Sequence, residues 1–449
     1  MQLLLSKLAE ILVCAPPKSD LMLTGTVIDS RKVKAGDLFL ALKGEHVDGH
    51  DYLESARLLG AAAAIVTKQQ QDALPQLVVD NVEEAFAKLA KYWREQCNTK
   101  VIAITGSNGK TTLKEMVASI LCQCGSVIAT QGNLNNELGV PLTLSRLDSE
   151  TDYAVIEMGA NHSGEIARLV AMAKPHISVI NNVAAAHLEG FRSIDGVAKA
   201  KGEILSGLAG DGVGVINADM SFLSEWKQVF TGKQLVTFAL DANADITAKD
   251  MAQKTRSSHF IVELDNAYHF VNLPLPGRHN IANALAAIAI THALNIPTSA
   301  VVKGLAEMKS VPHRLELKEG VNQSRIIDDS YNANPGSYQQ ALALLARFDG
   351  EHWLVLGDFG ELGDDAEQIH TQMGIDAKNS GVDRLWTIGR KAKLAAESFG
   401  NGAEHFSNVS EAQEQLTAAL SDNVTCLVKG SRFMQLDKLA DKLVVRGES

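Results

Sequence analysis

Apolar residues occur along the chain in short runs separated by polar loops, and the way in which strand and helix patterns alternate changes twice. Up to about residue 98, the runs VIDS, DLFLALKG, AAIV and QLVVD mix with helical patterns, which indicates a small α/β module. From Lys100, the runs VIAIT, YAVIEMGA, HISVINNVAA and GVGVINAD are bounded by polar loops, as expected of buried parallel strands. After VPHRLE, the strand-and-helix alternation restarts with RIIDDSY, HWLVLGD, RLWTIG and TCLVKGS.

Two segments refine this picture. Between about 234 and 273, QLVTFAL, FIVELD and YHFVNL follow one another without helices, which predicts an antiparallel appendage. HNIANALAAIAITHAL is a strongly apolar helix after the break LPLPGR, and further helices are predicted from Pro335 and around 365–379. We therefore predict an α/β protein of three domains: a small N-terminal α/β domain (1–98), a central mononucleotide-binding domain with a mostly parallel sheet (99–313) and a C-terminal Rossmann-like domain (314–449).

Composition and charge narrow the possible functions. The 449 residues are 46% hydrophobic and 21% charged, and the formal net charge is −11. Such an acidic surface argues against broad contact with nucleic acid or a membrane surface. The N-terminal MQLLLSKLAEILVC is interrupted by Lys7 and Glu10, so it predicts an amphipathic helix rather than a signal peptide or a membrane span. We expect a soluble cytoplasmic protein without a membrane span and without a nucleic-acid partner, and we take a monomer as the working hypothesis.

The five cysteines are scattered along the chain. Cys122 and Cys124 are separated by one residue, a spacing that could indicate a metal site. They lie in the helical run LKEMVASILCQC, however, with no second Cys or His pair at zinc spacing. We interpret the cysteines as structural thiols in a reducing compartment.

One loop of the central region has the composition of a phosphate-binding site. In VIAITGSNGKTT it lies between an apolar strand and a helix predicted from about Thr111. Its glycines let backbone N–H groups converge on phosphate oxygens, and the helix N-terminus adds partial positive charge. Lys110 would reach the β- and γ-phosphates, and the Thr111 hydroxyl would ligate Mg²⁺. The predicted ATP-binding residues of this loop are Thr105, Gly106, Ser107, Asn108, Gly109, Lys110, Thr111 and Thr112.

The spacing of the loop departs from the common pattern GxxxxGK[ST], which would require glycine at Ile104, a strand residue here. The shortened TGSNGKTT form resembles the loop of the Mur ligase and folylpolyglutamate synthase superfamily. EMGAN, NNVAAAHLEGF, AKAKGEI, GRHNIANALAA, PHRLE and DDSYNANP are similar to segments of that superfamily, in the same order. The resemblance implies an ATP-dependent amide ligase that activates a carboxylate as an acyl phosphate.

The resemblance also implies roles for residues that follow the predicted strands. Glu157, at a strand end, would supply an oxygen ligand that suits Mg²⁺. His187 would be a second metal ligand, although from chemistry alone it would be an ordinary hydrogen-bonding histidine, because Mg²⁺ prefers oxygen. Lys201 matches the family's carbamylated lysine, which ligates a second Mg²⁺. Without the resemblance Lys201 would be a solvated helix lysine, as we interpret Lys199. The predicted catalytic residues are Lys110, Glu157, His187 and Lys201.

Four further residues are predicted to contact the nucleotide. Asn280 and Asn283 lie three residues apart on one helix face, and their amides could pair with adenine. Asn280 could instead, or also, cap that helix. Arg314 and Asp329 resemble residues that meet the phosphate and ribose from the C-terminal side. ATP would then lie between the central and C-terminal domains, which suggests domain closure on binding.

The N-terminal segment VIDSRKVKAGDLFLALKGEHVDGHDYL resembles the UDP-binding domain shared by MurE- and MurF-type ligases. A turn at 29–31 and a hairpin glycine at Gly44 are the alternative interpretations. The segment GNLNNELGVP is expected to face the pyrophosphate or the peptide. The predicted residues for the UDP substrate are Ser30, Arg31, Lys43, Gly44, Asp48 and His50, together with Asn133, Asn135 and Asn136.

The C-terminal motifs favour one type within the superfamily. DDSYNANPGS, LGDFGELG and LVKGSR look like the MurF type, which joins D-alanyl-D-alanine to UDP-N-acetylmuramoyl-tripeptide. The DNPR string of MurE-type enzymes that add diaminopimelate does not occur. Arg432 could counter a carboxylate or form an interfacial salt bridge. The predicted residues for the dipeptide are Tyr331, Asn332, Asn334, Asp358 and Glu361.

Two other classes of function stay open at this point. One is another amide ligase of the superfamily, of the MurE or folylpolyglutamate type. The other is a non-catalytic nucleotide-dependent switch that uses the same loop. The switch is disfavoured, because Glu157, His187 and Lys201 would have no reason to occur together in it.

Overall fold

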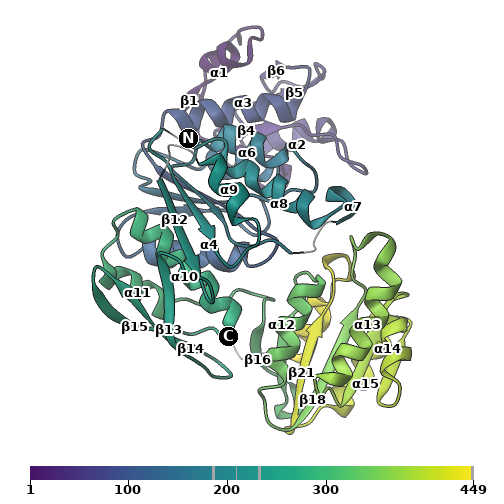
Figure 1. The fold of residues 1–449 in the computed structure, drawn as a ribbon. Helices are drawn as coiled ribbons and strands as arrows, with labels where there is room; N and C mark the ends of the chain where they lie inside the picture. Colours follow the sequence, from purple (N-terminus) through teal and green to yellow (C-terminus); the bar gives the residue numbers. More distant parts are fainter. Residues whose placement is uncertain (185–187, 209, 231–233, 446–449) are drawn as a thin grey trace.

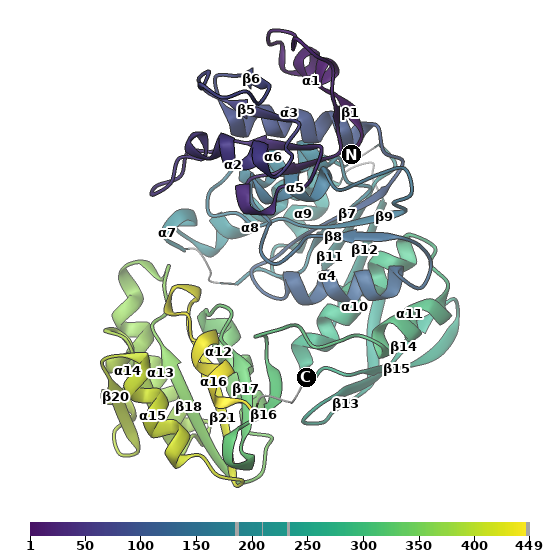
Figure 2. The ribbon, with the colours of Figure 1, turned by 180° about the vertical axis from the view of Figure 1, so that it is seen from behind.

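The computed structural model describes residues 1–184, 188–208, 210–230 and 234–445. In these residues the chain forms three consecutive α/β units, each built around its own larger sheet (Figure 1). The C-terminal unit stands apart from the other two, and the view from behind shows the same separation (Figure 2). The predicted fold class, a three-domain α/β protein, is confirmed.

The N-terminal unit has four parallel strands in the order β3-β4-β5-β6. A short ladder of β1 and β2 lies beside helix α1, whose buried face packs against α3. Thus the amphipathic N-terminal segment forms a short strand and then the predicted helix. The elements are β1 (Leu3–Leu4), α1 (Leu5–Leu12), β2 (Met22–Leu23), β3 (Gly25–Val27), η1 (Ser30–Lys32), β4 (Asp37–Leu40), η2 (Gly49–Tyr52), α2 (Leu53–Leu58), β5 (Ala63–Val66), β6 (Gln76–Val78) and α3 (Val82–Glu95).

The central unit has a nine-stranded sheet in the order β15-β14-β13-β12-β11-β10-β7-β9-β8. The strands from β8 to β13 in this order run parallel, and β14 and β15 complete the sheet as an antiparallel edge. The strands are β7 (Lys100–Thr105), β8 (Val127–Ala129), β9 (Tyr153–Glu157), β10 (Ile177–Ile180), β11 (Val213–Asn217), β12 (Gln234–Ala239), β13 (Ile246–Gln253), β14 (Ser258–Leu264) and β15 (Ala267–Leu273).

Helices cover both faces of this sheet, as the long apolar runs of its strands require. One core joins the sheet to α4, α10 and α11, and the other joins it to α3, α5, α6 and α9. The helices are α4 (Lys110–Leu121), α5 (Gly139–Leu144), α6 (Glu165–Ala173), α7 (Leu188–Phe191), α8 (Ile194–Gly202), η3 (Glu203–Leu205), α9 (Leu223–Val229), α10 (Arg278–Ala293) and α11 (Thr298–Ala306).

The C-terminal unit has six strands in the order β16-β17-β21-β18-β19-β20, all parallel except β16. Helices α12, α13 and α14 pack on one face, and α15 and α16 on the other. The elements are β16 (Glu316–Glu319), η4 (Val321–Gln323), β17 (Arg325–Asp329), α12 (Pro335–Leu345), β18 (Glu351–Gly357), η5 (Gly363–Asp365), α13 (Ala366–Asn379), β19 (Arg384–Ile388), α14 (Ala392–Phe399), β20 (Ala403–Phe406), α15 (Val409–Ala419), β21 (Val424–Lys429), η6 (Arg432–Met434) and α16 (Asp437–Leu443).

The structure corrects the predicted appendage. QLVTFAL is β12, which pairs in parallel with both β11 and β13, so only the pairs β13–β14 and β14–β15 are antiparallel. The appendage is therefore an extension of the central sheet. The prediction also missed β13, whose sequence ITAKDMAQ has no apolar run because most of its side chains are at least partly exposed. Among the described helices, none is both long and apolar enough to span a membrane.

Candidate active site

A cavity of about 730 Å³ lies between the central and C-terminal units. The carboxyl ends of β7, β9, β10 and β17 all open into it, as expected for ligand sites of open α/β sheets. The predicted site residues that line it are Ser107, Asn108, Gly109, Lys110, Thr111, Thr112, Asn133, Asn135, Asn136, Glu157, Lys201, Asn280, Asn283, Arg314, Asp329, Tyr331, Asn332, Asn334 and Glu361. One cavity thus collects most of the predicted phosphate, nucleotide and dipeptide residues.

The phosphate loop turns sharply from β7 into α4. Gly109 caps the helix with a left-handed φ of 74°, and a β-carbon there would lie 2.6 Å from Asn283 Oδ1. Glycine is therefore required both by the backbone conformation and by the close neighbour. Thr105 and Gly106 do not line the cavity; the Thr105 hydroxyl donates to Met158 O at 2.9 Å and joins β7 to β9.

A network of asparagine side chains holds the loop, and the sequence analysis missed it. The Asn108 N–H donates to Asn182 Oδ1 at 2.8 Å, and Asn182 Nδ2 donates back to Asn108 O at 2.9 Å. Asn181 Nδ2 contacts both Asn108 O (3.1 Å) and Asn283 Oδ1 (2.8 Å). The sequence did contain a signal for this network: Asn181 and Asn182 directly follow the apolar strand in VINNVA. Their side-chain amides can bond to both the N–H and the C=O groups of a loop backbone.

Glu157 and Thr111 form the polar centre of the site. The buried Thr111 hydroxyl donates to Glu157 Oε2 at 2.9 Å, and Asn135 Nδ2 donates to Glu157 Oε1 at 2.8 Å. From the C-terminal side, Arg314 Nη2 donates to Thr111 Oγ1 at 3.0 Å, while its guanidinium lies 4.2 Å from the centre of the Tyr331 ring. A hydroxyl and a carboxylate side by side are oxygen donors of the type that Mg²⁺ takes in proteins.

Two lysines line the same cavity, Lys110 partly buried and Lys201 buried. Lys110 Nζ donates to Gly106 O at 2.7 Å, and burial lowers its pKa although the charge of Glu157 raises it. Lys201 is 2% exposed, and burial together with the charge of Lys110 lowers its pKa well below 10.5. The solvated helix lysine considered for Lys201 is therefore wrong, whereas Lys199 is exposed. His187, the other predicted metal ligand, lies outside the described residues.

The predicted nucleotide residues occupy the α10 and β17 sides of the cavity. Gly277, not Asn280, caps α10; Asn280 Nδ2 instead donates to Pro276 O at 2.7 Å. Asp329 forms an ion pair with the buried Lys429, a residue that the sequence analysis did not select. Burial raises the pKa of Asp329, and the charge of Lys429 opposes that rise. His279, also missed, contacts Gln340 of α12 at 3.3 Å.

The predicted dipeptide residues divide into two groups. Tyr331, Asn332, Asn334 and Glu361 line the cavity. Asp358 does not line it, and its carboxylate accepts from the N–H groups of Lys391 (3.0 Å) and Ala392 (2.7 Å), at the start of α14.

The predicted UDP residues of the N-terminal unit lie outside the cavity, whereas the three asparagines of GNLNNELGVP line it. Asp48 accepts from His50 Nδ1 at 2.6 Å, and His50 Nε2 accepts from the Thr67 N–H at 2.9 Å, so His50 is the Nδ1–H tautomer. The exposed Arg31 forms an ion pair with Asp29 at 2.9 Å, within the turn that was the alternative interpretation. Arg432 lines the cavity and pairs with Asp437 at 2.9 Å, a salt bridge within the C-terminal unit.

Three family models match successive parts of the chain. They are described as Mur ligase family, catalytic domain (residues 23–97), Mur ligase middle domain (104–291) and Mur ligase, glutamate ligase domain (313–432). The chain belongs to the Mur ligase family. A relative from Escherichia coli, the UDP-N-acetylmuramoyl-tripeptide–D-alanyl-D-alanine ligase, is 43% identical over 99% of this chain and 98% of its own length.

Solved structures agree with this assignment to the Mur ligases. MurF from Acinetobacter baumannii has a TM-score of 0.91 at 34% identity and covers 99% of both chains. MurF from Thermotoga maritima, solved with ADP, has a TM-score of 0.82 at 27% identity and covers 93% of this chain and 96% of its own. The resemblance predicted from the motifs is confirmed, both for the Mur ligase family and for its MurF type, and the chain is an enzyme of the ligase class.

Proposed function

We propose that this Mur ligase joins D-alanyl-D-alanine to UDP-N-acetylmuramoyl-tripeptide and converts ATP to ADP and phosphate. One observation carries the proposal. Thr111, at the end of the phosphate loop, bonds to Glu157 of the central unit and to Arg314, which reaches it from the C-terminal unit. A peptide ligase needs this arrangement, because phosphoryl transfer to a carboxylate brings two anions together. The names of the relatives support the choice of substrates.

The reaction would proceed in two steps. A carboxylate oxygen of the tripeptide attacks the γ-phosphorus of ATP, so that an O–P bond forms and ADP leaves. The amine of the dipeptide then attacks the acyl carbon, phosphate leaves as the C–O bond breaks, and the amine loses a proton. Lys110 and Arg314 line the cavity, and their positive charges would neutralise negative charge on the transferred group.

Mg²⁺ is the proposed cofactor, held by Thr111 and Glu157 and by His187. The donor chemistry of the described part of this set fits, because both groups offer oxygen and lie 2.9 Å apart. When bound, the ion would offset negative charge on the phosphates. A carbamate on Lys201 would add an anionic ligand for a second ion. Burial supports that proposal, since the lowered pKa leaves more of the neutral amine that reacts with CO₂.

The domain roles are proposed with the boundaries 1–98, 99–313 and 314–449. The N-terminal domain would bind the UDP end of the substrate through its predicted residues, with Asn133, Asn135 and Asn136 nearer the peptide. The central domain would bind ATP through the loop 105–112 together with Asn280 and Asn283, aided by Arg314 and Asp329. Tyr331, Asn332, Asn334 and Glu361 would hold the dipeptide; Asp358 is the weakest candidate, because its carboxylate already caps α14. The enzyme would act in the cytoplasm as a monomer.

One assay tests the function directly. ADP release is measured with ATP, Mg²⁺ and UDP-N-acetylmuramoyl-tripeptide, in the presence and absence of D-alanyl-D-alanine. We expect turnover only when the dipeptide is present, and mass spectrometry should identify the pentapeptide product. Turnover without the dipeptide, or with a different amine only, would exclude the proposed reaction in favour of another ligase of the superfamily.

A further inference from the structure

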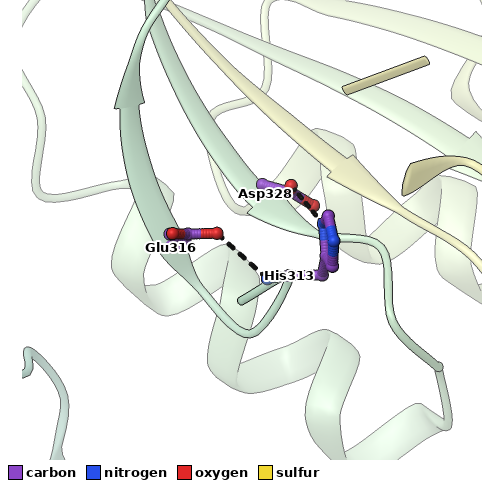
Figure 3. Close-up of side chains that lie close together, drawn as sticks. All are labelled: His313, Glu316 and Asp328. Carbon is purple, nitrogen blue, oxygen red and sulfur yellow. Dashed lines mark hydrogen bonds and ion pairs between the residues drawn. The ribbon is translucent and has the colours of Figure 1, made fainter. Parts of the chain in front are cut away.

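A cluster of ionisable side chains lies where the linker from the central unit meets strands β16 and β17, and the proposed reaction does not use it. His313, Glu316 and Asp328 place their ligand atoms within 4.8 Å of one another (Figure 3). Such a group could hold a metal ion. Here, however, the Lys318 ammonium lies 2.7 Å from Asp328 Oδ2 and 3.1 Å from Glu316 Oε2. The positive charge that the carboxylates need is already supplied, so the cluster is a structural clamp.

The clamp fixes the backbone on both sides of Arg314. His313 Nδ1 donates to Asp328 Oδ2 at 2.8 Å, and the His313 N–H donates to Glu316 Oε2 at 3.1 Å. On the other side, the Leu315 N–H donates to Asp329 Oδ1 at 3.2 Å. His313 and Leu315 both have left-handed φ values, 61° and 51°, which non-glycine residues adopt only where the surroundings hold them.

The Arg314 N–H itself donates to Val311 O at 3.2 Å, on the central side of the linker, so Arg314 projects from a backbone that is held on both sides of the boundary. Its guanidinium crosses to the central unit and donates to Thr111 Oγ1 at 3.0 Å, while it stacks on Tyr331. The Tyr331 N–H also donates to His313 O at 3.1 Å, so the stacking partner is tied to the same clamp. A long arginine side chain has many rotamers, and stacking on a ring that is itself held in place restricts them, which reduces the entropy lost on binding.

We propose that His313 is a positioning residue that acts through Arg314. Its hydrogen bond to the fully buried Asp328 sets the direction in which Arg314 leaves the linker, and hence places the guanidinium at the nucleotide phosphates. The phosphate contact rests on the proposed function. The geometry of the clamp does not, because all of its contacts lie within the described chain.

The test is a double-mutant cycle on nucleotide binding. Dissociation constants of a non-hydrolysable ATP analogue with Mg²⁺ are measured by calorimetry for the wild-type enzyme, His313→Phe, Arg314→Ala and the double variant. Phenylalanine keeps a ring but removes the donor, and Asp328 retains Lys318 and Ser330 as partners, so the fold should survive. We expect about tenfold weaker binding for His313→Phe in the wild-type background and less than a twofold change in the Arg314→Ala background.

Three controls separate this role from a general loss of stability. His352→Phe alters a histidine of the same unit that contacts Phe348 O at the start of β18, away from the cavity, and it should change binding less than twofold. His313→Asn keeps a side-chain donor and tolerates a left-handed φ, so it should recover part of the affinity. Thermal unfolding of each variant shows whether it folds. If His313→Phe does not fold, the cycle is run with His313→Asn and His313→Gln. In both, the loss of affinity should again be smaller in the Arg314→Ala background than in the wild-type background.

The outcomes are distinct. Equal losses in the two backgrounds, or no loss in His313→Phe, would overturn the positioning role. If the wild-type enzyme binds the ATP analogue but forms no amide bond with the proposed substrates, the proposed function is refuted. The mutant cycle would still test the positioning role of His313, because it measures nucleotide binding alone.

Discussion

The side-chain amide of Asn334 donates a 2.6 Å hydrogen bond to Asn108 Oδ1, across the boundary between the C-terminal and central units. The same Asn334 is the N-cap of α12, where its oxygen accepts from the Ser337 N–H at 2.9 Å. One residue thus caps a helix and contacts the phosphate loop. Because the Asn108 backbone is held by Asn181 and Asn182, the position of α12 is coupled to the loop that would bind ATP.

Replacing Asn334 with serine should separate these two roles. Serine caps helices about as well as asparagine, but it is too short to reach Asn108. A hydrogen bond contributes about 1 kcal/mol, so we expect about a fivefold loss in kcat/KM for ATP with little change in melting temperature. The matched control is Asn408→Ser, which alters the N-cap of α15 on the same unit and should leave activity unchanged. An equal loss in both variants would contradict the coupling.

Glu157 gives a prediction about the metal. Glu157→Gln removes a charged oxygen ligand but keeps the size of the side chain, so the Mg²⁺ concentration for half-maximal activity should rise at least tenfold. Maximal activity should fall by about a hundredfold, because charge neutralisation in the transition state is lost. Titration of ADP release with Mg²⁺ measures both effects. Glu165→Gln, at the same cavity but bonded to the Asn161 N–H, is the control and should keep the wild-type Mg²⁺ dependence.

The sequence predicted the strands with continuous apolar runs, because a parallel sheet covered on both faces leaves such runs in the sequence. The helix predicted from Pro335 begins at that residue, since proline and the asparagine before it mark a helix start. Strands β13, β16 and β20 were missed because their side chains are mostly polar or partly exposed. Long-range sheet pairing gives them their structure, and no local pattern reports it.

The same limit applies to the candidate site. Motif spacing predicted Lys110, Thr111 and Glu157, which lie together in the cavity. It did not predict that Lys429 pairs with Asp329, because residues 100 positions apart become neighbours only through the parallel pairing of β17 and β21. Likewise, the burial of Lys201 is a tertiary property, and a helix pattern alone suggested a solvated side chain.

His279 predicts a pH dependence of stability. Burial lowers its pKa from the ordinary value of 6.5 to about 4. Between these values the unfolded chain takes up a proton that the folded chain does not, so stability falls as the pH is lowered from 6.5 toward 4. His279→Gln removes this contribution, about 1–2 kcal/mol at pH 4.5 once partial exposure of the ring is considered.

Urea unfolding at pH 7 and pH 4.5 measures the effect. The loss of stability on acidification should be smaller in His279→Gln than in the wild-type enzyme. His352→Gln, at the start of β18, is the matched histidine-to-glutamine control. If His279→Gln lost as much stability as the wild type between the two pH values, the His279 imidazole would not be the cause.

Lys201 gives the most direct test of the proposed chemistry. If its amine carries a carbamate that ligates a metal ion, Lys201→Ala should lose at least a hundredfold in activity, because the second metal ion then loses an anionic ligand. Short carboxylates such as acetate should restore part of that loss, since they can occupy the vacated space with the same donor group. Lys199→Ala, two residues away on the exposed face of α8, should keep wild-type activity and show no response to acetate.

The measurement is ADP release with and without added carboxylate. Full activity of Lys201→Ala in the absence of carboxylate would remove the carbamate from the mechanism. A folded but inactive variant without rescue would show that activity needs the Lys201 side chain and would contradict a carbamate that a free carboxylate can replace.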